Sequence, residues 1–197
     1  FVDLDNFKAI NDSLGHTVGD EYLKQVAASL SQSVRKSDMV SRHGGDEFVI
    51  GLTDVANEQD VISAASTVLE RLTRAFMARE AEISASCSIG IAMYPDDGVD
   101  YESLLREADI AMYQAKEAGR NTFRFFDAAM NTNLQQNLLL VSSLRTALAR
   151  QEFVLHYQPV MDLERDRLVG AEALVRWMHP EKGLIPPMEF IPAAEKS

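Results

Sequence analysis

The sequence has little of what disulfide-stabilised, membrane-spanning or nucleic-acid-binding proteins need. Cys87 is the one cysteine in 197 residues, so no internal disulfide can form, and its apolar neighbours indicate a buried thiol in a reducing compartment. No apolar run approaches the ~20 residues of a membrane span. Lys and Arg number 19 against 30 Asp and Glu, and the net charge of −11 disfavours binding to a nucleic-acid backbone. We therefore expect a cytoplasmic protein, with no membrane contact in this chain and no nucleic-acid partner.

The first residues do not have the pattern expected of a leader. The chain begins with Phe1, without a charged segment or a cleavage site, and a strand-like pattern starts at once. We expect a part of a longer protein, in which any membrane anchor or sensor domain lies outside this chain. An apolar content of 46% excludes a disordered polymer, and 197 residues suffice for one domain of about 100–150 residues and part of another.

Hydrophobic periodicity predicts the order of elements in the first part of the chain. Strands are expected at residues 1–4, 39–41, 48–52, 83–93 and 123–126, and helices at 19–34, 58–77 and 101–118. Residues 6–16 carry turn chemistry, and residues 119–121 are a helix stop. This order predicts an α/β (α+β) sandwich with helices on a mainly antiparallel sheet, ending near residue 127.

A different pattern follows. Apolar residues at helical steps from Leu134 through Leu138 to Leu148 predict a connecting helix within residues 128–150. Two strands are expected at 153–161 and 168–177, before a Pro-rich segment that runs to residue 197. The unit at 151–197 is too short to be a complete large domain.

Two acidic pairs are candidates for a metal site. Asp3 and Asp5 bracket Leu4 at the end of the first strand, where alternation points both carboxylates to one face; Asp46 and Glu47 follow two glycines. If the hairpin packs beside the first strand, the four acids converge and require cations such as Mg²⁺ or Mn²⁺. Taken separately, each pair is also typical of an acidic surface turn or helix start.

Several motifs occur in a characteristic order. Residues 42–48, Arg-His-Gly-Gly-Asp-Glu-Phe, resemble the defining motif of the GGDEF family of diguanylate cyclases. The upstream segments 3–8, 11–12, 15–16 and 19–20 and the distal segments 88–90, 108–109, 113, 115–116 and 119–121 resemble further motifs of that family. The resemblance covers residues 1–127. It implies the condensation of two GTP molecules into cyclic di-GMP and pyrophosphate, on a palm-like fold similar to that of adenylyl cyclases.

The resemblance also implies roles for single residues. Asp3, the Leu4 carbonyl and Asp46 would hold Mg²⁺ or Mn²⁺, and Glu47 would be a further ligand or would help to take the 3′-hydroxyl proton. For GTP, the guanine would be recognised by Asn11 and Asp20, and the phosphates would meet Lys8, Lys116 and Arg120. Because Gly44 and Gly45 lack side chains, they would let the nucleotide approach the backbone closely. His16 is either a ligand contact or a structural loop residue.

Arg35 and Asp38 lie just ahead of the glycine pair. An Arg-x-x-Asp sequence by itself is more often an ion pair at a helix end. Its offset from Gly44 resembles the family's inhibitory site, where the arginine and the aspartate would grip the product, cyclic di-GMP. We expect the regulatory role.

The tail carries a second resemblance. Tyr-Gln-Pro at 157–159, Glu-Ala-Leu-Val-Arg-Trp at 172–177, and the His-Pro, Ile-Pro and Phe-Ile-Pro segments that follow resemble the start of an EAL domain, the family of cyclic di-GMP phosphodiesterases. Glu172 would be a metal ligand, with Gln158 and Arg176 as substrate contacts. Alone, Glu172 would be a strand-end acid paired with Arg176. That family has a TIM-like barrel, of which this chain would hold the first strands.

The sequence thus predicts a diguanylate cyclase domain at 1–127, lacking its usual N-terminal segment, a helical linker at 128–150 and a truncated EAL domain at 151–197. Each GTP would be held by one protomer, so catalysis would require a homodimer. The alternative is a module that senses GTP or cyclic di-GMP and regulates an EAL phosphodiesterase, although intact metal acids disfavour it. A palm-like polymerase would need a cationic groove, which the acidic composition does not supply.

Overall fold

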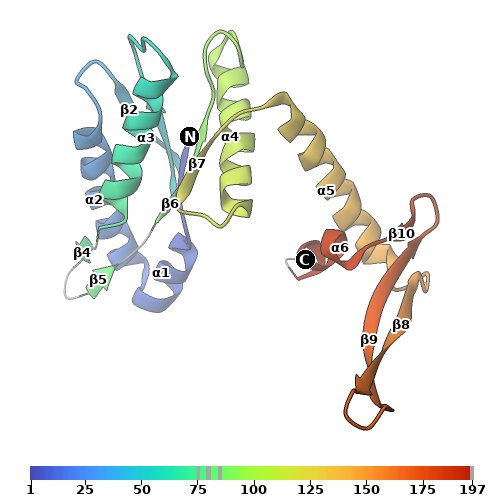
Figure 1. The fold of residues 1–197 in the computed structure, drawn as a ribbon. Coiled ribbons are helices and arrows are strands. Elements are labelled where there is room, and N and C mark those ends of the chain that lie inside the picture. Colours follow the sequence, from blue (N-terminus) through green and yellow to red (C-terminus); the bar gives the residue numbers. More distant parts are fainter. Residues whose placement is uncertain (75, 79–80, 84–85, 196–197) are drawn as a thin grey trace. The chain divides into compact units, whose positions relative to one another are not determined.

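The computed structural model describes residues 1–74, 76–78, 81–83 and 86–195 (Figure 1). Contacts divide the chain into two units, Phe1–Asn131 and Thr132–Ser197. Among the described residues, no helix combines the length and the apolar character needed to cross a membrane.

Unit 1 is built on a five-stranded sheet with the strand order β2-β3-β1-β6-β7. The short central strand β1 (Val2–Leu4) is antiparallel to both neighbours, β3 (Glu47–Gly51) and β6 (Cys87–Ile91). Strand β2 (Met39–Gly44) forms a hairpin with β3, and β7 (Thr122–Phe125) runs parallel to β6. A separate two-stranded ribbon pairs β4 (Phe76–Ala78) with β5 (Ala81–Ile83). The expected α/β architecture with a mainly antiparallel sheet is confirmed.

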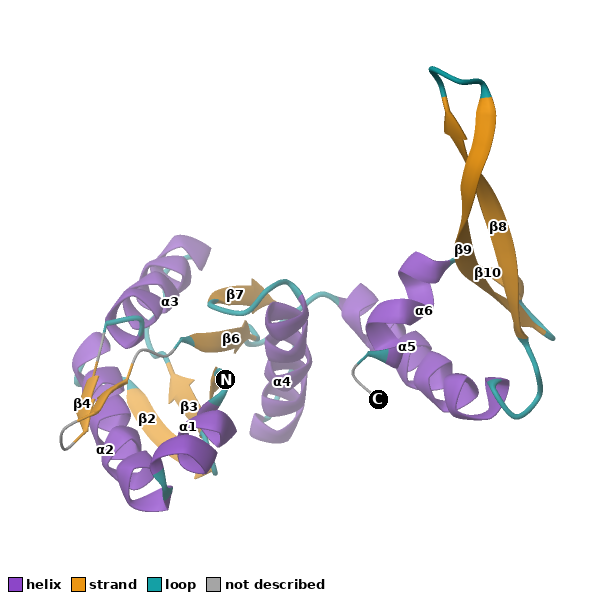
Figure 2. Cartoon of the chain, turned by 90° about the horizontal axis from the view of Figure 1, so that it is seen from below, coloured by secondary structure: helices purple, strands orange, loops and turns teal. Residues whose placement is uncertain are grey.

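Helices cover both faces of this sheet. On one face, α2 (His16–Ser33) and α3 (Glu58–Leu72) bury an apolar stripe that includes Tyr22, Val26 and Leu30, while α4 (Tyr101–Glu117) lies on the other face (Figure 2). The alternation along β1 puts Val2 and Leu4 into the core with α2 and α3. Asp3, between them, therefore faces α4.

The contact between α4 and β6 is unusually close. A Cβ atom built on Gly90 of β6 would lie 1.8 Å from the Ala108 carbonyl oxygen and 2.3 Å from the Met112 nitrogen. Only glycine fits there, because any side chain would push the helix off the strand. The middle of α4 is thereby held against β6, the neighbour of β1 in the sheet.

Three predictions in unit 1 need correction. Residues 6–16, expected as a turn, contain the helix α1 (Phe7–Leu14), whose amphipathic pattern buries Phe7. The helix predicted at 58–77 ends at Leu72, because Phe76 starts β4 and packs its ring edge-on against Tyr22. The strand predicted at 83–93 is divided between β5 and β6, and its residues 84–85 lie outside the described residues.

The predicted connecting helix is confirmed as α5 (Ala128–Ala147), although the side chains of residues 132–139 and 145 lie outside what the structure describes. In unit 2, β8 (Phe153–Asp162) and β9 (Arg167–His179) form a long hairpin, and β10 (Gly183–Ile185) completes an open sheet ordered β10-β9-β8. A helix that the sequence did not predict, α6 (Pro187–Ala194), follows, with Pro186 as N-cap and Pro187 and Pro192 inside it. A small core gathers at one end of the hairpin, comprising Leu140, Ala147, Trp177, Ile185 and Phe190.

Candidate functional site

The β2–β3 hairpin presents an open turn. Gly45 has a left-handed backbone, with φ of 47°, and no atom lies within 4 Å of a Cβ built on Gly44 or Gly45. Arg42 holds the turn, since its Nε and Nη2 atoms donate to the Gly45 carbonyl at 2.9 and 2.6 Å. A ligand can therefore reach the backbone here, and the turn that it meets is fixed in shape.

Strand pairing brings the two acidic segments together. Asp3 lies directly opposite Glu47 in the β1–β3 ladder, and the Leu4 amide donates to the Asp46 carbonyl at 3.2 Å. The Asp3 side chain is buried, and Lys116 of α4 places its ammonium 2.8 Å from Oδ2. Burial raises the pKa of Asp3, the nearby Asp46 and Asp5 carboxylates act in the same direction, and Lys116 opposes them. The predicted packing of the hairpin beside the first strand is confirmed.

The four acids do not gather into one cluster. Within the described ranges, no three His, Cys, Asp or Glu side chains are grouped so that they could hold a metal ion together. Asp5 is engaged elsewhere, because its carboxylate accepts hydrogen bonds from Ser86 Oγ at 2.5 Å, Ser88 Oγ at 2.8 Å and the Asn121 amide at 3.2 Å. Asp5 faces neutral donors rather than a cation.

Asp3 is different, because a cation already sits on it. The Lys116 ammonium at 2.8 Å from Oδ2 shows that this buried carboxylate attracts positive charge, and the Asp46 carboxylate is close enough to influence its pKa. Carboxylate and carbonyl oxygens are the ligands that Mg²⁺ and Mn²⁺ prefer. The donors offered by Asp3, Asp46, Glu47 and the Leu4 backbone therefore fit a hard divalent cation, provided that Lys116 gives way.

The helices α1 and α2 carry four predicted nucleotide contacts. Lys8, His16 and Asp20 are exposed, whereas Asn11 is partly buried and its Oδ1 atom has no hydrogen-bond partner among the described residues. A Cβ on Gly19 would lie 1.9 Å from that oxygen, so the glycine makes room for Asn11. A buried amide oxygen without a donor is costly, and a ligand that brings an N–H group would satisfy it.

The turn after α4 carries the other predicted phosphate contact. Gly119, Arg120 and Asn121 all have positive φ, at 112°, 63° and 47°, and Arg120 is exposed. Because Lys116 lies in the last turn of the same helix, the two cations leave α4 at the end nearest to β1.

Arg35 and Asp38 lie on a separate groove of about 360 Å³, bounded by α3. Asp38 is occupied locally: Oδ2 accepts from the Arg35 amide at 2.8 Å, and Oδ1 accepts from the Thr53 amide at 3.0 Å. These donors, led by the Thr53 amide, hold the pKa of Asp38 below its ordinary value. The carboxylate shapes the loop that presents Arg35.

In unit 2, the register of the β8–β9 hairpin places Gln158 directly opposite Glu172. Both side chains are exposed. Arg176 is partly buried, and its Nη1 donates to the neighbouring Val175 carbonyl at 3.0 Å. These three predicted residues therefore lie on one hairpin.

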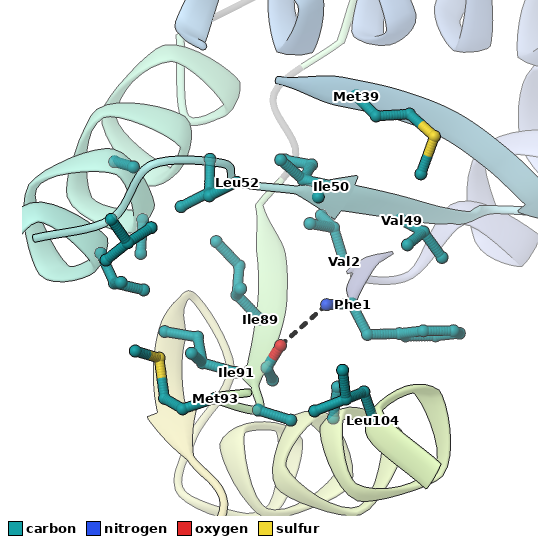
Figure 3. Close-up of a pocket in the computed structure, with 18 of the residues that line it drawn as sticks. Phe1, Val2, Met39, Val49, Ile50, Leu52, Ile89, Ile91, Met93 and Leu104 are labelled. Atoms are coloured by element: carbon teal, nitrogen blue, oxygen red, sulfur yellow. Dashed lines mark hydrogen bonds between the residues drawn. The ribbon is translucent and has the colours of Figure 1, made fainter. Parts of the chain in front are cut away.

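Sequence reasoning missed the contacts of Arg42, Ser86 and Ser88. Arg42 stands inside the quoted motif, but nothing in its spacing indicates a clamp on the turn, and Ser86 and Ser88 sit 80 residues or more from Asp5. A cavity of about 510 Å³ also lies elsewhere (Figure 3). Apolar side chains line most of it, Ile50, Leu52 and Ile89 among them, and none of the predicted site residues borders it. Cys87 is fully buried, as expected, and burial raises the pKa of its thiol.

Comparison with known proteins assigns a family to each part of the chain. Residues 1–122 match the family model described as diguanylate cyclase, GGDEF domain, and residues 141–197 match part of the EAL domain. The chain is 45% identical over its whole length to the bifunctional diguanylate cyclase/cyclic di-GMP phosphodiesterase MucR of Pseudomonas aeruginosa, and 42% identical to the cyclic di-GMP phosphodiesterase PdeR of Escherichia coli. It spans 29% and 30% of the lengths of these relatives.

Solved structures give the same result for the fold. An EAL/GGDEF domain protein from M. capsulatus is 45% identical with a TM-score of 0.62, and the match covers 64% of this chain and 81% of that one. The GGDEF domain of PA1120 from Pseudomonas aeruginosa is 36% identical with a TM-score of 0.66, covering 68% and 78%. The chain therefore belongs to the GGDEF family over residues 1–122 and continues, from residue 141, into part of an EAL domain.

Proposed function

We propose that unit 1 is a diguanylate cyclase domain, which condenses two GTP molecules into cyclic di-GMP and pyrophosphate. The observation that carries the proposal is the pairing of β1 with β3, which sets Asp3 opposite Glu47 and beside Asp46, next to an open glycine turn. A triphosphate brings strong negative charge, so it needs cations at the point where its backbone contacts are made. This corner of unit 1 offers carboxylates that can hold such cations and a glycine turn whose backbone is open to the phosphates.

The metal ions would be held by the oxygens of Asp3, Leu4, Asp46 and Glu47. Bound there, Mg²⁺ or Mn²⁺ would neutralise charge on the transferring phosphate. The chain's own cations add to this: Lys8, Lys116 and Arg120 meet the phosphates, and Lys116 is released from Asp3 when it does so. Glu47 is a further ligand or accepts the 3′-hydroxyl proton.

The guanine base is recognised at the α1–α2 elbow, the junction of the two helices at Gly15. The unpartnered Oδ1 of Asn11 accepts an N–H group from guanine, and the exposed Asp20 carboxylate accepts another. His16 lies at the start of α2 on the same elbow, where it contacts the nucleotide or shapes the loop. Gly44 and Gly45 give the phosphates access to the backbone.

One such site binds one nucleotide, so the 3′-hydroxyl of one GTP must attack the α-phosphate of another that is held by a second protomer. The reaction therefore requires a homodimer. Because GTP is the substrate, we place the reaction in the cytoplasm.

In the groove beside α3, Arg35 binds the product, cyclic di-GMP, as a feedback site, with Asp38 shaping the loop.

The test is to incubate the protein, with Mg²⁺, either with GTP or with cyclic di-GMP, and to resolve the nucleotides by chromatography. Formation of cyclic di-GMP from GTP supports the proposal. If GTP is unchanged by a longer form of the protein that contains the complete GGDEF and EAL domains, the cyclase proposal fails.

A second candidate has its own support. PdeR, at 42% identity, is named a phosphodiesterase alone, and Lys116 neutralises Asp3 in this structure. Unit 1 would then bind GTP or cyclic di-GMP and regulate an EAL phosphodiesterase through Glu172, Gln158 and Arg176. In the same assay, this candidate predicts no synthesis from GTP but a GTP-dependent rate of cyclic di-GMP hydrolysis by the longer protein.

A further inference from the structure

Asp5 is a buried carboxylate that the proposed chemistry does not use. Its side chain is 3% exposed, and its oxygens accept hydrogen bonds from Ser86, Ser88 and the backbone amide of Asn121. Its own amide donates to the Ser86 carbonyl at 2.9 Å. Three segments far apart in sequence, the end of β1, the start of β6 and the turn after α4, therefore meet at one side chain.

The turn that Asp5 holds needs support. Arg120 and Asn121 are both left-handed, at φ of 63° and 47°, and such a conformation is unfavourable for a residue with a side chain. A conformation of this kind persists when the surroundings impose it. The hydrogen bond from the Asn121 amide to Asp5 Oδ2, at 3.2 Å, ties this turn to the sheet.

Two residues of the β1 segment thus bind the end of α4 and the turn that follows it. Asp3 binds the side chain of Lys116, and Asp5, two residues later, binds the backbone of Asn121. The first contact is an ion pair that must open when Lys116 turns to a phosphate. The second involves no group of the proposed reaction, so the opening of the first does not require it to open.

We propose that Asp5 is a positioning residue, which fixes the left-handed turn after α4 and thereby aims Arg120 at the nucleotide phosphates. It acts by accepting a hydrogen bond, not by its charge and not as a metal ligand. The inference rests on the proposed GTP site, because Arg120 has no phosphate to meet otherwise.

The test measures binding of 3′-deoxy-GTP with Mg²⁺ to the full chain by calorimetry, because this analogue lacks the attacking hydroxyl and is not consumed. Asp5→Ala, which removes the acceptor, should weaken binding at least tenfold. Asp5→Asn keeps an acceptor oxygen and should stay within threefold of the unchanged chain. The matched variant Asp3→Asn should lose binding, because at that position the charge itself is needed.

A double-mutant cycle shows whether Asp5 acts through Arg120. Arg120→Ala alone should weaken binding about as much as Asp5→Ala, and the double variant should be no weaker than the worse single one. Ser86→Ala, which removes a different donor from Asp5, should lower thermal stability but leave affinity within twofold. A loss for Asp5→Asn equal to that for Asp5→Ala, or additive losses in the cycle, would overturn the proposal.

If Asp5→Ala does not fold, Asn121→Val tests the same contact from the exposed side, because a β-branched residue resists the left-handed conformation. Asn121→Val should weaken 3′-deoxy-GTP binding as much as Arg120→Ala does, and the variant that carries both changes should bind no more weakly than either alone. An additive loss of affinity counts against the proposal. If the unchanged chain binds no 3′-deoxy-GTP, the GTP site itself has failed. Hydrogen exchange of the Asn121 amide then tests the Asp5 contact: it should be protected in the unchanged chain and in Asp5→Asn, and an unprotected amide overturns the contact.

Discussion

Strands β1 and β8 show how differently two strands of one chain are used. β1 has three residues, all buried between helices on both faces of the unit 1 sheet, whereas most of the ten residues of β8 are exposed. Each places a polar side chain opposite a glutamate, Asp3 opposite Glu47 and Gln158 opposite Glu172. The pairing is similar in both, but the surroundings are not.

The difference shows how the surroundings of a carboxylate on a strand decide whether it can attract a cation. Asp3 is 6% exposed, its pKa is raised mainly by burial, and α4 supplies a cation to it. Glu172 is exposed, and the residues facing it come from the same hairpin. A second layer of structure, more than the local sequence, gives a carboxylate the charge environment that phosphate chemistry requires.

The sharpest test of this comparison is hydrolysis. We expect the 197-residue chain not to hydrolyse cyclic di-GMP, although it contains Glu172, because a metal-activated water needs several converging acids, and none converge on Glu172 among the described residues. Chromatography after incubation with Mg²⁺ or Mn²⁺ measures this. Hydrolysis that disappears in Glu172→Gln would show that an open sheet can assemble the site.

The corresponding acids of unit 1 should matter greatly. Asp46→Asn or Glu47→Gln should reduce cyclic di-GMP synthesis more than about tenfold, because each removes charge from a site that must offset a triphosphate. The measurement is initial rate in a longer form of the protein that makes cyclic di-GMP, with circular dichroism to show that the fold is intact. Near-normal turnover in either variant would favour the sensor function instead.

Truncating a leucine should lower the free energy of unfolding more in the buried strand of unit 1 than in the exposed hairpin of unit 2. Leu4→Ala in β1 should cost about 2–5 kcal/mol, because Leu4 is 1% exposed in the core, whereas Leu168→Ala in β9, at 62% exposed, should stay within about 0.5 kcal/mol. Urea unfolding followed by circular dichroism measures both. The single tryptophan, Trp177, lies buried in unit 2, so its fluorescence follows that unit alone. Equal costs for the two leucines would remove the contrast.

Within unit 1, the groove beside α3 should have a milder role than the acids of the candidate metal site. Arg35→Ala should weaken inhibition by cyclic di-GMP without lowering the initial rate, because Arg35 lies on a groove that Asp3 and Asp46 do not border. Calorimetry with cyclic di-GMP checks the binding directly. If affinity is unchanged, Arg35 and Asp38 serve only the loop between α2 and β2.

Periodicity and motif order predicted most of unit 1, because its helices and strands alternate in hydrophobicity as their burial requires. The stripe of Tyr22, Val26 and Leu30 is fully buried, as its spacing indicates. The helix α1 was missed because the Asn-Asp-Ser segment is typical of turns, and its tertiary contact through Phe7 outweighs that preference. The helix α6 was missed because it contains Pro192.

The sequence predicted which residues belong to the candidate site better than it predicted the contacts that these residues make. The hypothesis that the hairpin packs beside the first strand correctly put Asp3 next to it, whereas strand alternation treated Asp3 and Asp5 as equivalent. They differ because Lys116 reaches one and Ser86, Ser88 and Asn121 reach the other. Contacts that join residues more than 80 positions apart leave no periodic trace in the sequence, so these could be found only in three dimensions.

The smallest expected effect concerns Asp38, which is only partly exposed and is tightly hydrogen-bonded. The Thr53 and Arg35 amides hold the pKa of Asp38 below its ordinary value, so its ionised form stabilises the fold above the unfolded pKa of about 4, and this contribution is lost as pH falls through the folded pKa. Asp38→Asn should therefore lower the free energy of unfolding at pH 7 by on the order of 0.5 kcal/mol, since solvent screens a partly exposed group.

The pH dependence separates this effect from a general loss of packing. As the pH falls below about 4, the unchanged Asp38 becomes protonated, and the difference between the two proteins should shrink toward zero. Thr53→Val offers a control, since it removes the hydroxyl but keeps the amide donor, and the pH dependence should persist in it. A difference that stays constant between pH 7 and pH 3 would mean that the charge of Asp38 contributes nothing, and that even on the exposed surface of unit 1 packing alone decides.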